Sequence, residues 1–308
     1  MNSAKLSVTF LGTSSAAPTN YRGLPAIAIR REGHVILMDC GEGVQRQVLA
    51  QSIGLGKDMT ILITHLHGDH VTGLLGLLQT MSLAQRRKPV VIVAPAKLLR
   101  WLEVSSDLLN FGLTFPIRFV AARPGVVLRT PEFKVRAARA SHSVEAFSYL
   151  VEELGRPGVF HPEKAKALGV PEGRLWSALQ KGRSVTVGGR KVASSEVAGP
   201  PRPGRRIGYS GDTRPSPRLA RFFEGCDLLI FDSTFRGSDR DKALERMHST
   251  CVEAAGLAKE AGVRRLALTH FSARYTSATA LLREARKVFH DTVAAADGLT
   301  LAVDYPPV

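Results

Sequence analysis

Cysteine and long apolar runs are both scarce in this chain of 308 residues. The three cysteines, at positions 40, 226 and 251, include no CxxC pair, which argues against a disulfide framework and favours a reducing, intracellular compartment. No apolar run approaches the roughly 20 residues that a membrane-spanning helix needs, and the first ten residues lack the apolar stretch of a secretory signal. We therefore expect a soluble, cytoplasmic protein with no membrane attachment.

Acidic residues are also few relative to basic ones. The chain has 27 Asp and Glu against 42 Lys and Arg, so its formal net charge is +15 and its pI is near 10.2. A field of this sign attracts polyanions, and nucleic acid is the commonest polyanionic partner. A generally basic proteome would give the same charge, and charge alone does not distinguish RNA, DNA and an anionic membrane.

No internal repeat is present, so the fold class follows from local patterns. Short runs of β-branched residues predict strands, and longer runs with apolar residues at i, i+3 and i+4 predict helices. Strands are predicted over residues 6–11, 26–30, 34–38, 61–64, 90–93, 117–120, 133–137, 147–151, 206–209, 228–231, 266–268 and 299–303. Helices are predicted over residues 43–51, 71–84, 217–223, 250–261 and 277–289. The predicted class is α/β, with sheets covered by helices.

One stretch departs from this pattern. Residues 155–206 hold eleven Lys and Arg and three Glu, a local net charge of 11 − 3 = +8, and are rich in Gly and Pro. A short helix over 163–168 and a hairpin over 184–192 are predicted inside it. A solvated loop is the alternative, but a structureless loop of this length is uncommon in a compact domain. We expect residues 1–308 to form one domain with residues 154–204 as an inserted arm.

Residues 65–70 (HLHGDH) carry the clearest chemical signal. Three imidazoles and one carboxylate follow the apolar strand predicted over 61–64, and ligands at the carboxyl end of a strand are held by a rigid element and open to solvent. Histidine and aspartate together suit zinc, and Gly68 permits a tight backbone between them. We predict a hydrolase with a two-metal centre built around this motif.

Six residues cannot complete two metal sites, so further ligands are expected at other strand ends. Three positions have that placement: His142, Asp212 and His270. The histidines at positions 34, 161 and 290 lack it. His248 lies just before a predicted helix whose cap is Ser249 or Thr250.

With these motifs the chain resembles the metallo-β-lactamase superfamily and, within it, the ribonuclease Z family, endonucleases that remove the 3′ trailer from precursor tRNA. The resemblance implies an αβ/βα sandwich of two sheets flanked by helices, with an inserted arm. It is carried by residues 10–18 (FLGTSSAAP), 39–43 (DCGEG), 65–70 (HLHGDH), 211–215 (GDTRP), 248–250 (HST) and 269–275 (THFSARY).

The same resemblance implies two zinc ions per subunit. By this resemblance one zinc is held by His65, His67 and His142, the other by Asp69, His70 and His270, and Asp212 bridges the two. Asp69 is implied to orient or deprotonate the attacking water, and His248 with Asp232 to protonate the leaving 3′ oxygen. The implied substrate-binding residues are Arg22, Ser249, Thr250, Arg274, Lys181 and Arg183. The family further implies a homodimer and an arm that grips the tRNA elbow.

The chain departs from the family pattern in three places. The motif usually written HEAT reads FDST at residues 231–234, so its acid is the shorter Asp232. The family's PxKxRN loop, which contacts the 3′ end of the tRNA, reads PTNYRG at residues 18–23. Of its polar residues that contact RNA, only the arginine remains, as Arg22. The arm has Gly173-Arg174 where Gly-Pro is expected.

Two other hypotheses stay open. Another hydrolase of the superfamily, acting on a small phosphodiester or a sulfate ester, would explain the metal ligands but not the basic arm. A binding protein with a structural metal and no turnover would leave Asp69, Asp212 and His248 in catalytic placements without a role. Only a dizinc endoribonuclease acting on precursor tRNA uses the metal ligands, the arm and residues 248–250 together.

Overall fold

The structure is a computed structural model that describes residues 5–305. It divides into two compact units. We call the first the body; it contains the residues up to 130, residues 134–152 and the residues from 205 onward. We call the second the arm; it contains residues 131–133 and 153–204.

The first sheet of the body has seven strands. Strands β4 to β7 run parallel, and β18, β1 and β3 are antiparallel to their neighbours. β3 and β4 form an antiparallel hairpin that pairs from Ile27–Met38 to Arg31–His34. The strand order is β18 (Thr300–Ala302), β1 (Leu6–Gly12), β3 (Ala26–Arg31), β4 (His34–Met38), β5 (Asp58–Leu62), β6 (Val90–Ala94) and β7 (Ile117–Ala121).

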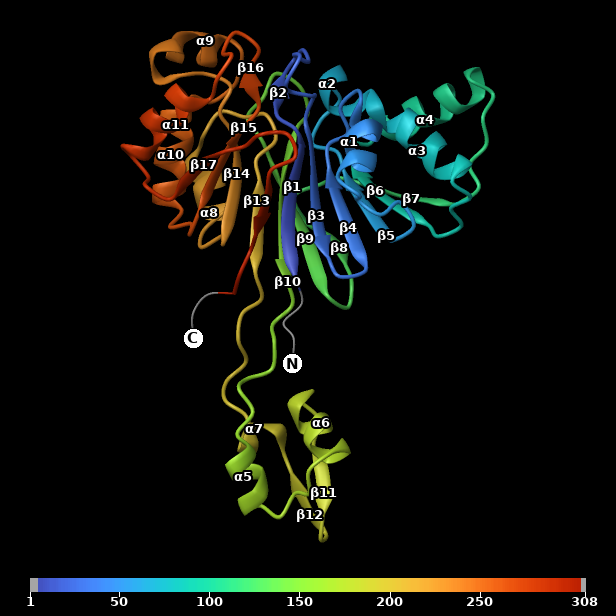
Figure 1. Ribbon diagram of the computed structural model, residues 1–308, viewed down its shortest axis with the longest axis vertical. Helices are drawn as coiled ribbons and strands as arrows, with labels where there is room; N and C mark the ends of the chain where they lie inside the picture. Colours follow the sequence, from blue (N-terminus) through green and yellow to red (C-terminus); the bar gives the residue numbers. More distant parts are fainter. Residues whose placement is uncertain (1–4, 306–308) are drawn as a thin grey trace. The chain divides into compact units, whose positions relative to one another are not determined.

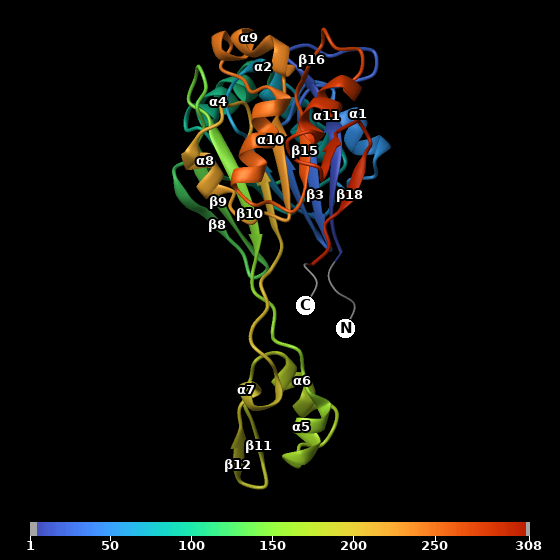
Figure 2. The same ribbon diagram turned by 90° about the vertical axis from the view of Figure 1, so that its left-hand side faces the viewer.

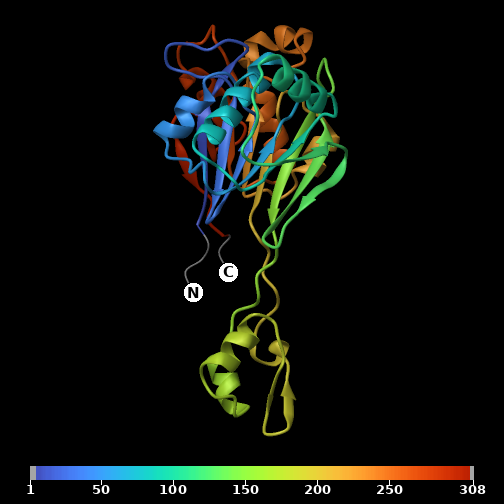
Figure 3. The ribbon, with the colours of Figure 1, turned by 90° about the vertical axis from the view of Figure 1, so that its right-hand side faces the viewer.

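Four helices cover the outer face of this sheet, as Figure 3 shows from that side. They are α1 (Val44–Ala50), α2 (Gly68–Val71), α3 (Gly73–Leu83) and α4 (Lys97–Leu108). Leu74, Leu78 and Leu98 from these helices are buried in one cluster with Leu37 and Ile61 of the sheet. Burying such side chains contributes about 1.5 to 3 kcal/mol each, which fixes the helices on the sheet.

The second sheet of the body also has seven strands, and β13, β14, β15 and β17 are parallel. Its order is β17 (Thr292–Ala294), β15 (Leu266–Thr269), β14 (Leu228–Asp232), β13 (Arg206–Tyr209), β10 (Phe147–Glu153), β9 (Phe133–Arg139) and β8 (Gly125–Arg129). Figure 2 shows its outer face covered by α8 (Pro217–Phe222), α10 (Cys251–Glu260) and α11 (Thr279–Arg286). Thr250 is the N-cap of α10, in a capping box with Glu253.

The two sheets face each other with the helices outside, so the predicted α/β sandwich is confirmed (Figure 1). The sheets touch through Tyr149, whose hydroxyl donates to the carbonyl of Ile63 at 2.8 Å. The remaining short elements of the body are β2 (Ser14–Ser15), β16 (Phe271–Ser272), the 3-10 helix η1 (Gly237–Asp239) and α9 (Arg240–Glu245). Figure 1 shows β2, β16 and α9 at one end of the sandwich. In the part of the chain that the structure describes, no helix combines the length and apolar character needed to cross a bilayer.

Several element boundaries differ from the prediction. Strand β5 spans Asp58–Leu62 rather than 61–64, and helical structure begins at Gly68 rather than at residue 71. Helix α4 and strand β8 were not predicted. In α4, exposed Val104 and Leu108 blur the apolar stripe, and β8 is an edge strand with little buried surface.

The arm has a small core of its own. Its apolar side chains pack together, with Ala165, Val170, Leu179, Val185, Val192 and Val197 buried. Strands β11 (Val185–Val187) and β12 (Arg190–Val192) form the hairpin predicted over residues 184–192. The helices are α5 (Pro162–Ala167), α6 (Arg174–Gln180) and α7 (Ser194–Val197). This stretch is therefore folded rather than a solvated loop.

Candidate metal centre

The candidate ligands gather where strands of both sheets end. His65 follows β5, Asp212 follows β13, His270 follows β15, and Asp232 is the last residue of β14. His142 lies in the loop between β9 and β10. Since parallel strands present their carboxyl ends at one edge of a sheet, these side chains meet at one edge of the sandwich.

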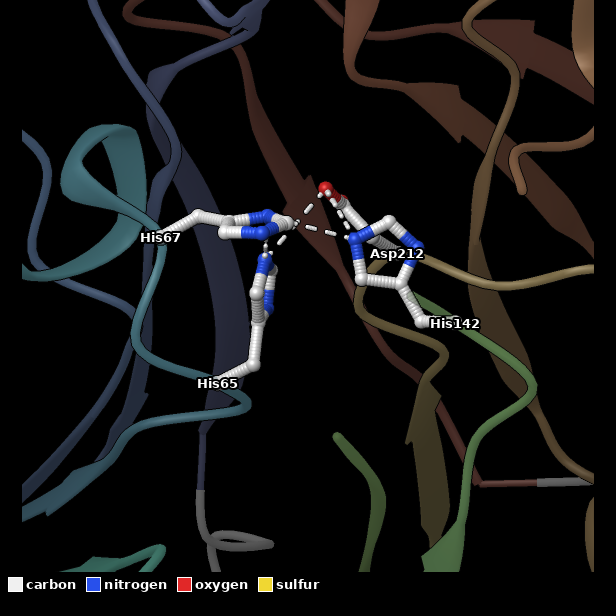
Figure 4. Close-up of side chains that lie close together, drawn as sticks. All are labelled: His65, His67, His142 and Asp212. Atoms are coloured by element: carbon white, nitrogen blue, oxygen red, sulfur yellow. Dashed lines mark hydrogen bonds and ion pairs between the residues drawn. The ribbon is translucent and has the colours of Figure 1, made fainter. Parts of the chain in front are cut away.

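The first group of candidate ligands consists of His65, His67, His142 and Asp212, whose ligand atoms lie within 4.8 Å of one another. Figure 4 shows the three rings and the carboxylate turned toward a common point. His67 Nδ1 lies 3.0 Å from His65 Nε2 and 3.2 Å from His142 Nε2. Asp212 Oδ2 lies 3.6 Å from His65 Nε2 and 4.0 Å from His142 Nε2.

The second group consists of Asp69, His70, Asp212 and His270, again within 4.8 Å of one another. His70 Nε2 lies 3.3 Å from His270 Nε2 and 3.2 Å from Asp212 Oδ2. Asp69 Oδ2 lies 3.6 Å from His70 Nε2 and 3.5 Å from His270 Nε2. Asp212 belongs to both groups, so its carboxylate is the element that the two share.

These spacings fit divalent cations. Two ligand atoms at about 2.0–2.1 Å from a tetrahedral zinc ion lie roughly 3.3 Å apart. The nitrogens of His70 and His270 are 3.3 Å apart, and those of His65 and His67 are 3.0 Å apart. The spacing of these nitrogens is therefore that of atoms that share one small cation.

The tautomers of the histidines also fit metal binding. In four of them Nδ1, the ring nitrogen that faces away from the centre, is a hydrogen-bond donor. A metal-ligating imidazole usually donates its other N–H to a fixed acceptor. The four Nδ1 contacts are His65 to Thr64 Oγ1 (3.0 Å), His70 to Asp39 Oδ2 (2.7 Å), His142 to the carbonyl of Met247 (3.0 Å) and His270 to Thr234 Oγ1 (2.9 Å). Both threonine hydroxyls donate to carboxylates, so they accept from the imidazoles. In the neutral form of each ring, Nε2 therefore keeps its lone pair for the centre.

Burial and charge set the protonation of the candidate ligands. Burial lowers the pKa of His65 to about 2, so this ring is neutral. Burial acts in the same direction on the pKa of His70, but the carboxylates of Asp212 and Asp39 outweigh it and raise that pKa above its ordinary value. Burial raises the pKa of Asp69, but the hydrogen bond to His270 and the charge of His70 outweigh it and hold that pKa below its ordinary value. The donor set thus contains ionised carboxylate for a cation to neutralise.

Asp39 is a member of the centre that was not predicted. It is fully buried, and its carboxylate accepts from the Thr64 amide at 2.8 Å, the Tyr209 hydroxyl at 2.8 Å and His70 Nδ1 at 2.7 Å. Asp39 directly follows β4, as Asp212 follows β13. The strand-end position that pointed to Asp212 could have found it too.

Replacing Asp39 by asparagine should lower metal affinity about 10- to 100-fold, the usual effect of losing a partner behind a ligand. The amide offers one acceptor atom where the carboxylate offers two, so Thr64, Tyr209 and His70 cannot all keep their bonds. Competition with a chromophoric chelator measures the affinity. Asp58→Asn is the control, because Asp58 is exposed and pairs with Lys88 on the surface. An unchanged affinity in Asp39→Asn would show that His70 does not need this partner.

His248 and Asp232 lie beside the two ligand groups. His248 Nδ1 is 2.9 Å from Asp232 Oδ2, so the shorter acid of the FDST motif does reach the histidine. Asp232 is buried and also accepts from the amides of Thr213 and Thr234 at 3.1 and 3.0 Å. Burial lowers the pKa of His248, but the carboxylate of Asp232 outweighs it and raises that pKa to about 9. His248 stacks on His270 with ring centroids 5.2 Å apart.

Three of the six residues predicted to bind substrate are buried and bonded inside the protein. Arg22 donates to the carbonyl of Tyr275 at 2.6 Å, and its guanidinium lies 5.3 Å from the centre of the Phe271 ring. Ser249 Oγ donates to the Thr213 carbonyl, and Thr250 caps α10. The other three, Arg274, Lys181 and Arg183, are exposed. A substrate contact stays a prediction for all six.

Comparisons with known proteins agree with this geometry. Two protein-family models match the chain. The model described as "Anti-Pycsar protein Apyc1" matches residues 6–108, and the model described as "Beta-lactamase superfamily domain" matches residues 178–271. The ribonuclease Z of Nitrosopumilus maritimus is 45% identical over 298 residues, which cover 97% of this chain and 100% of that protein. The ribonuclease Z of Methanosarcina acetivorans is 44% identical over 98% of this chain and 99% of that protein. The crystal structure of human tRNase Z, short form, matches with a TM-score of 0.71 and 28% identity, covering 97% of this chain and 99% of that one.

Proposed function

Since this chain belongs to the ribonuclease Z family, we propose that its metal centre cuts precursor tRNA at the start of the 3′ trailer and leaves a 3′-hydroxyl on the tRNA. The observation that carries this function is the 45% identity to a ribonuclease Z over 97% of the chain, a span long enough to hold both the centre and the arm. The chain is a metal-dependent phosphodiester hydrolase, and the metallo-β-lactamase fold is confirmed.

We propose two zinc ions per subunit as the cofactor. The donors are imidazole and carboxylate, the borderline set that zinc prefers. One ion is assigned to His65, His67 and His142, the other to Asp69, His70 and His270, with Asp212 shared. Bound there, the two cations would activate water for attack and offset the negative charge of the scissile phosphate.

Residues of the chain accept the proton that water loses and donate the proton that the leaving oxygen needs. The oxygen of water attacks phosphorus, and Asp69 accepts the proton that this water loses. The bond between phosphorus and the 3′ oxygen breaks, and the oxygen leaves with the electron pair. His248 donates a proton to that oxygen while Asp232, 2.9 Å from its Nδ1, holds the ring. The phosphate stays on the trailer, and the tRNA keeps the 3′-hydroxyl.

Asp69 is held for its role by the loop that precedes β3. Its Oδ2 accepts from the backbone amide of Ala16 at 2.9 Å, in addition to facing His70 and His270. This bond fixes the carboxylate at the rim of the centre, where it is partly exposed with 12% of the side chain accessible. An incoming water can therefore reach it.

We propose that the arm binds folded RNA through its charge. Two of its cations, Lys166 and Arg190, pair with acids of the arm. Within residues 5–305 no acidic partner at ion-pair distance is found for five exposed cations of the arm, which are Lys164, Arg174, Lys181, Arg183 and Lys191. Unpaired cations on a small folded unit suit recognition by shape and backbone phosphate.

The function is tested by incubating metal-loaded protein with a tRNA transcript that carries a 3′ trailer and mapping both products. We expect one cut beside the discriminator base. If the protein leaves this transcript intact but hydrolyses a small phosphodiester, the activity belongs to another kind of hydrolase of the superfamily.

We also propose a homodimer, as the family resemblance implies, and a cytoplasmic location, which the scarcity of cysteine and of long apolar runs favours. Sedimentation equilibrium should give twice the 33.3 kDa mass of the chain. A mass of 33.3 kDa at micromolar concentration would contradict the dimer.

A further inference from the structure

Arg214 lies just outside the predicted site but contacts one of its residues. It is the second residue after Asp212, and 13% of its side chain is exposed. Its NH1 donates to the backbone carbonyl of His248 at 2.5 Å. No other side chain of the described residues is found donating to that carbonyl.

The guanidinium is held in place by Glu253 on its other side. Arg214 NH1 is 2.9 Å from Glu253 Oε2, and NH2 bonds to Oε1, which makes the pair bidentate. Glu253 is itself fixed, because it accepts from the amide and the hydroxyl of Thr250 at 3.0 Å each in the capping box of α10. Because the planar guanidinium is hydrogen-bonded to both carboxylate oxygens, the Arg214 side chain has little freedom to adopt another orientation.

The backbone around Arg214 joins the same loops. Its amide donates to the carbonyl of Ser141 at 2.9 Å, next to a predicted ligand. The carbonyl of Thr213 accepts from Ser249 Oγ at 2.5 Å. The short segment after Asp212 is therefore hydrogen-bonded to the loop that contains Ser141 and to the loop that contains Ser249. These bonds fix the positions of both loops relative to the Asp212 carboxylate.

The loop that Arg214 holds includes a residue in a costly conformation. Met247, directly before His248, has a φ of 58°. A residue other than glycine adopts this left-handed backbone conformation only when the surrounding structure enforces it. The carbonyl of Met247 is bonded to His142, and that of His248 to Arg214. These two bonds hold the backbone on either side of the imidazole.

We propose that Arg214 is a positioning residue for His248: it anchors the backbone of the general acid to the segment that carries Asp212. This inference rests on the proposed role of His248 as proton donor to the leaving 3′ oxygen. Arg214 touches neither the substrate nor the ligand atoms. Without the Arg214 side chain, the His248 imidazole moves away from the position in which it can donate to the leaving oxygen. A misplacement of about 1 Å lowers the rate roughly 100-fold.

The test compares two substrates that differ in their need for a proton. Precursor tRNA releases an alkoxide, which needs general acid, whereas bis(4-nitrophenyl) phosphate releases a nitrophenolate, which leaves unaided. Zinc-loaded Arg214→Ala should lose about 10- to 100-fold in kcat on precursor tRNA with little change in KM. Its zinc content and its rate on bis(4-nitrophenyl) phosphate should stay near those of the unchanged protein.

Two further variants and one additive sharpen the test. Arg240→Ala is the matched control, because Arg240 also faces Glu253, at 3.7 Å, but does not touch the His248 carbonyl; its kcat should be unchanged. Arg214→Lys should recover only part of the rate, because an ammonium cannot grip Glu253 at two points. Guanidinium ion at millimolar concentration should restore part of the rate of Arg214→Ala.

The outcomes separate this inference from the function on which it rests. His248→Ala should show the same split as Arg214→Ala, slow on RNA and nearly normal on the nitrophenyl ester. If His248→Ala shows the split and Arg214→Ala is normal on both substrates, the positioning role is wrong while the general acid stands. If Arg214→Ala loses zinc and both activities, and guanidinium does not restore them, Arg214 supports the metal centre instead. If His248→Ala cuts RNA normally, both assignments fail.

Discussion

Replacing Asp212 by alanine should empty both metal positions and lower RNA cleavage by at least roughly 1000-fold, a typical scale for losing a main catalytic element. Its Oδ2 lies 3.2 Å from His70 Nε2 and 3.6 Å from His65 Nε2, and its Oδ1 lies 3.3 Å from His270 Nε2. Because one carboxylate faces both ligand groups, its removal weakens both at once. Zinc per chain by elemental analysis, with single-turnover cleavage, measures the effect.

The control for this variant is Asp291→Ala. Asp291 is a half-exposed aspartate that pairs with Arg265 on the surface, so its loss should leave zinc and activity in place. A variant of Asp212 that still binds two zinc ions per chain would show that the two positions do not depend on this carboxylate. In that case the shared-ligand assignment is wrong.

Removing the arm should separate RNA binding from hydrolysis. Arg156 and Arg202 exchange backbone hydrogen bonds at 2.8 and 2.9 Å, so the chain enters and leaves the arm side by side. Residues 157–201 can therefore be replaced by a short glycine linker. All candidate ligands belong to the body, so hydrolysis of bis(4-nitrophenyl) phosphate should be nearly unchanged.

Binding of precursor tRNA should weaken about 100-fold on this deletion, and its salt dependence should flatten. Each lost phosphate contact lowers the slope of log affinity against log salt by about 0.7 to 0.9. Titrations at several salt concentrations measure both quantities. A double variant of the full-length chain, Lys181→Gln with Arg183→Gln, should shift the slope in the same direction by a smaller amount. Loss of both activities in the deletion would mean that the body needs the arm to fold.

The candidate ligands that the sequence predicts lie close together in the structure, for a physical reason. Asp212 and His270 each follow an apolar run, and an apolar run that ends in a polar residue marks the carboxyl end of a buried strand. In parallel sheets these ends converge. Asp39 has the same placement after β4 and belongs to the motif at residues 39–43, but that motif contains no histidine, so nothing in it points to a metal centre.

Side-chain direction is what the sequence does not supply. Arg22, Ser249 and Thr250 belong to motifs beside the centre, which suggested contact with substrate. The structure turns all three inward, where they bond to Tyr275, Thr213 and Glu253. Arg214 shows the converse: its motif at residues 211–215 stands out in the sequence, but its bond to the His248 carbonyl depends on the packing of α10 against β14 and β15, which no local pattern encodes.

The central claim is that water attacks the scissile phosphate and that the 3′ oxygen of the tRNA leaves with a proton from His248. Cleavage of precursor tRNA in ¹⁸O-labelled water, followed by mass analysis of both products, tests this most directly. We predict one ¹⁸O atom in the 5′-phosphate of the released trailer and an unlabelled 3′-hydroxyl on the tRNA. A tRNA product that ends in a 2′,3′-cyclic phosphate or a 3′-phosphate would contradict the account, because the phosphate would then have stayed on the wrong side of the cut.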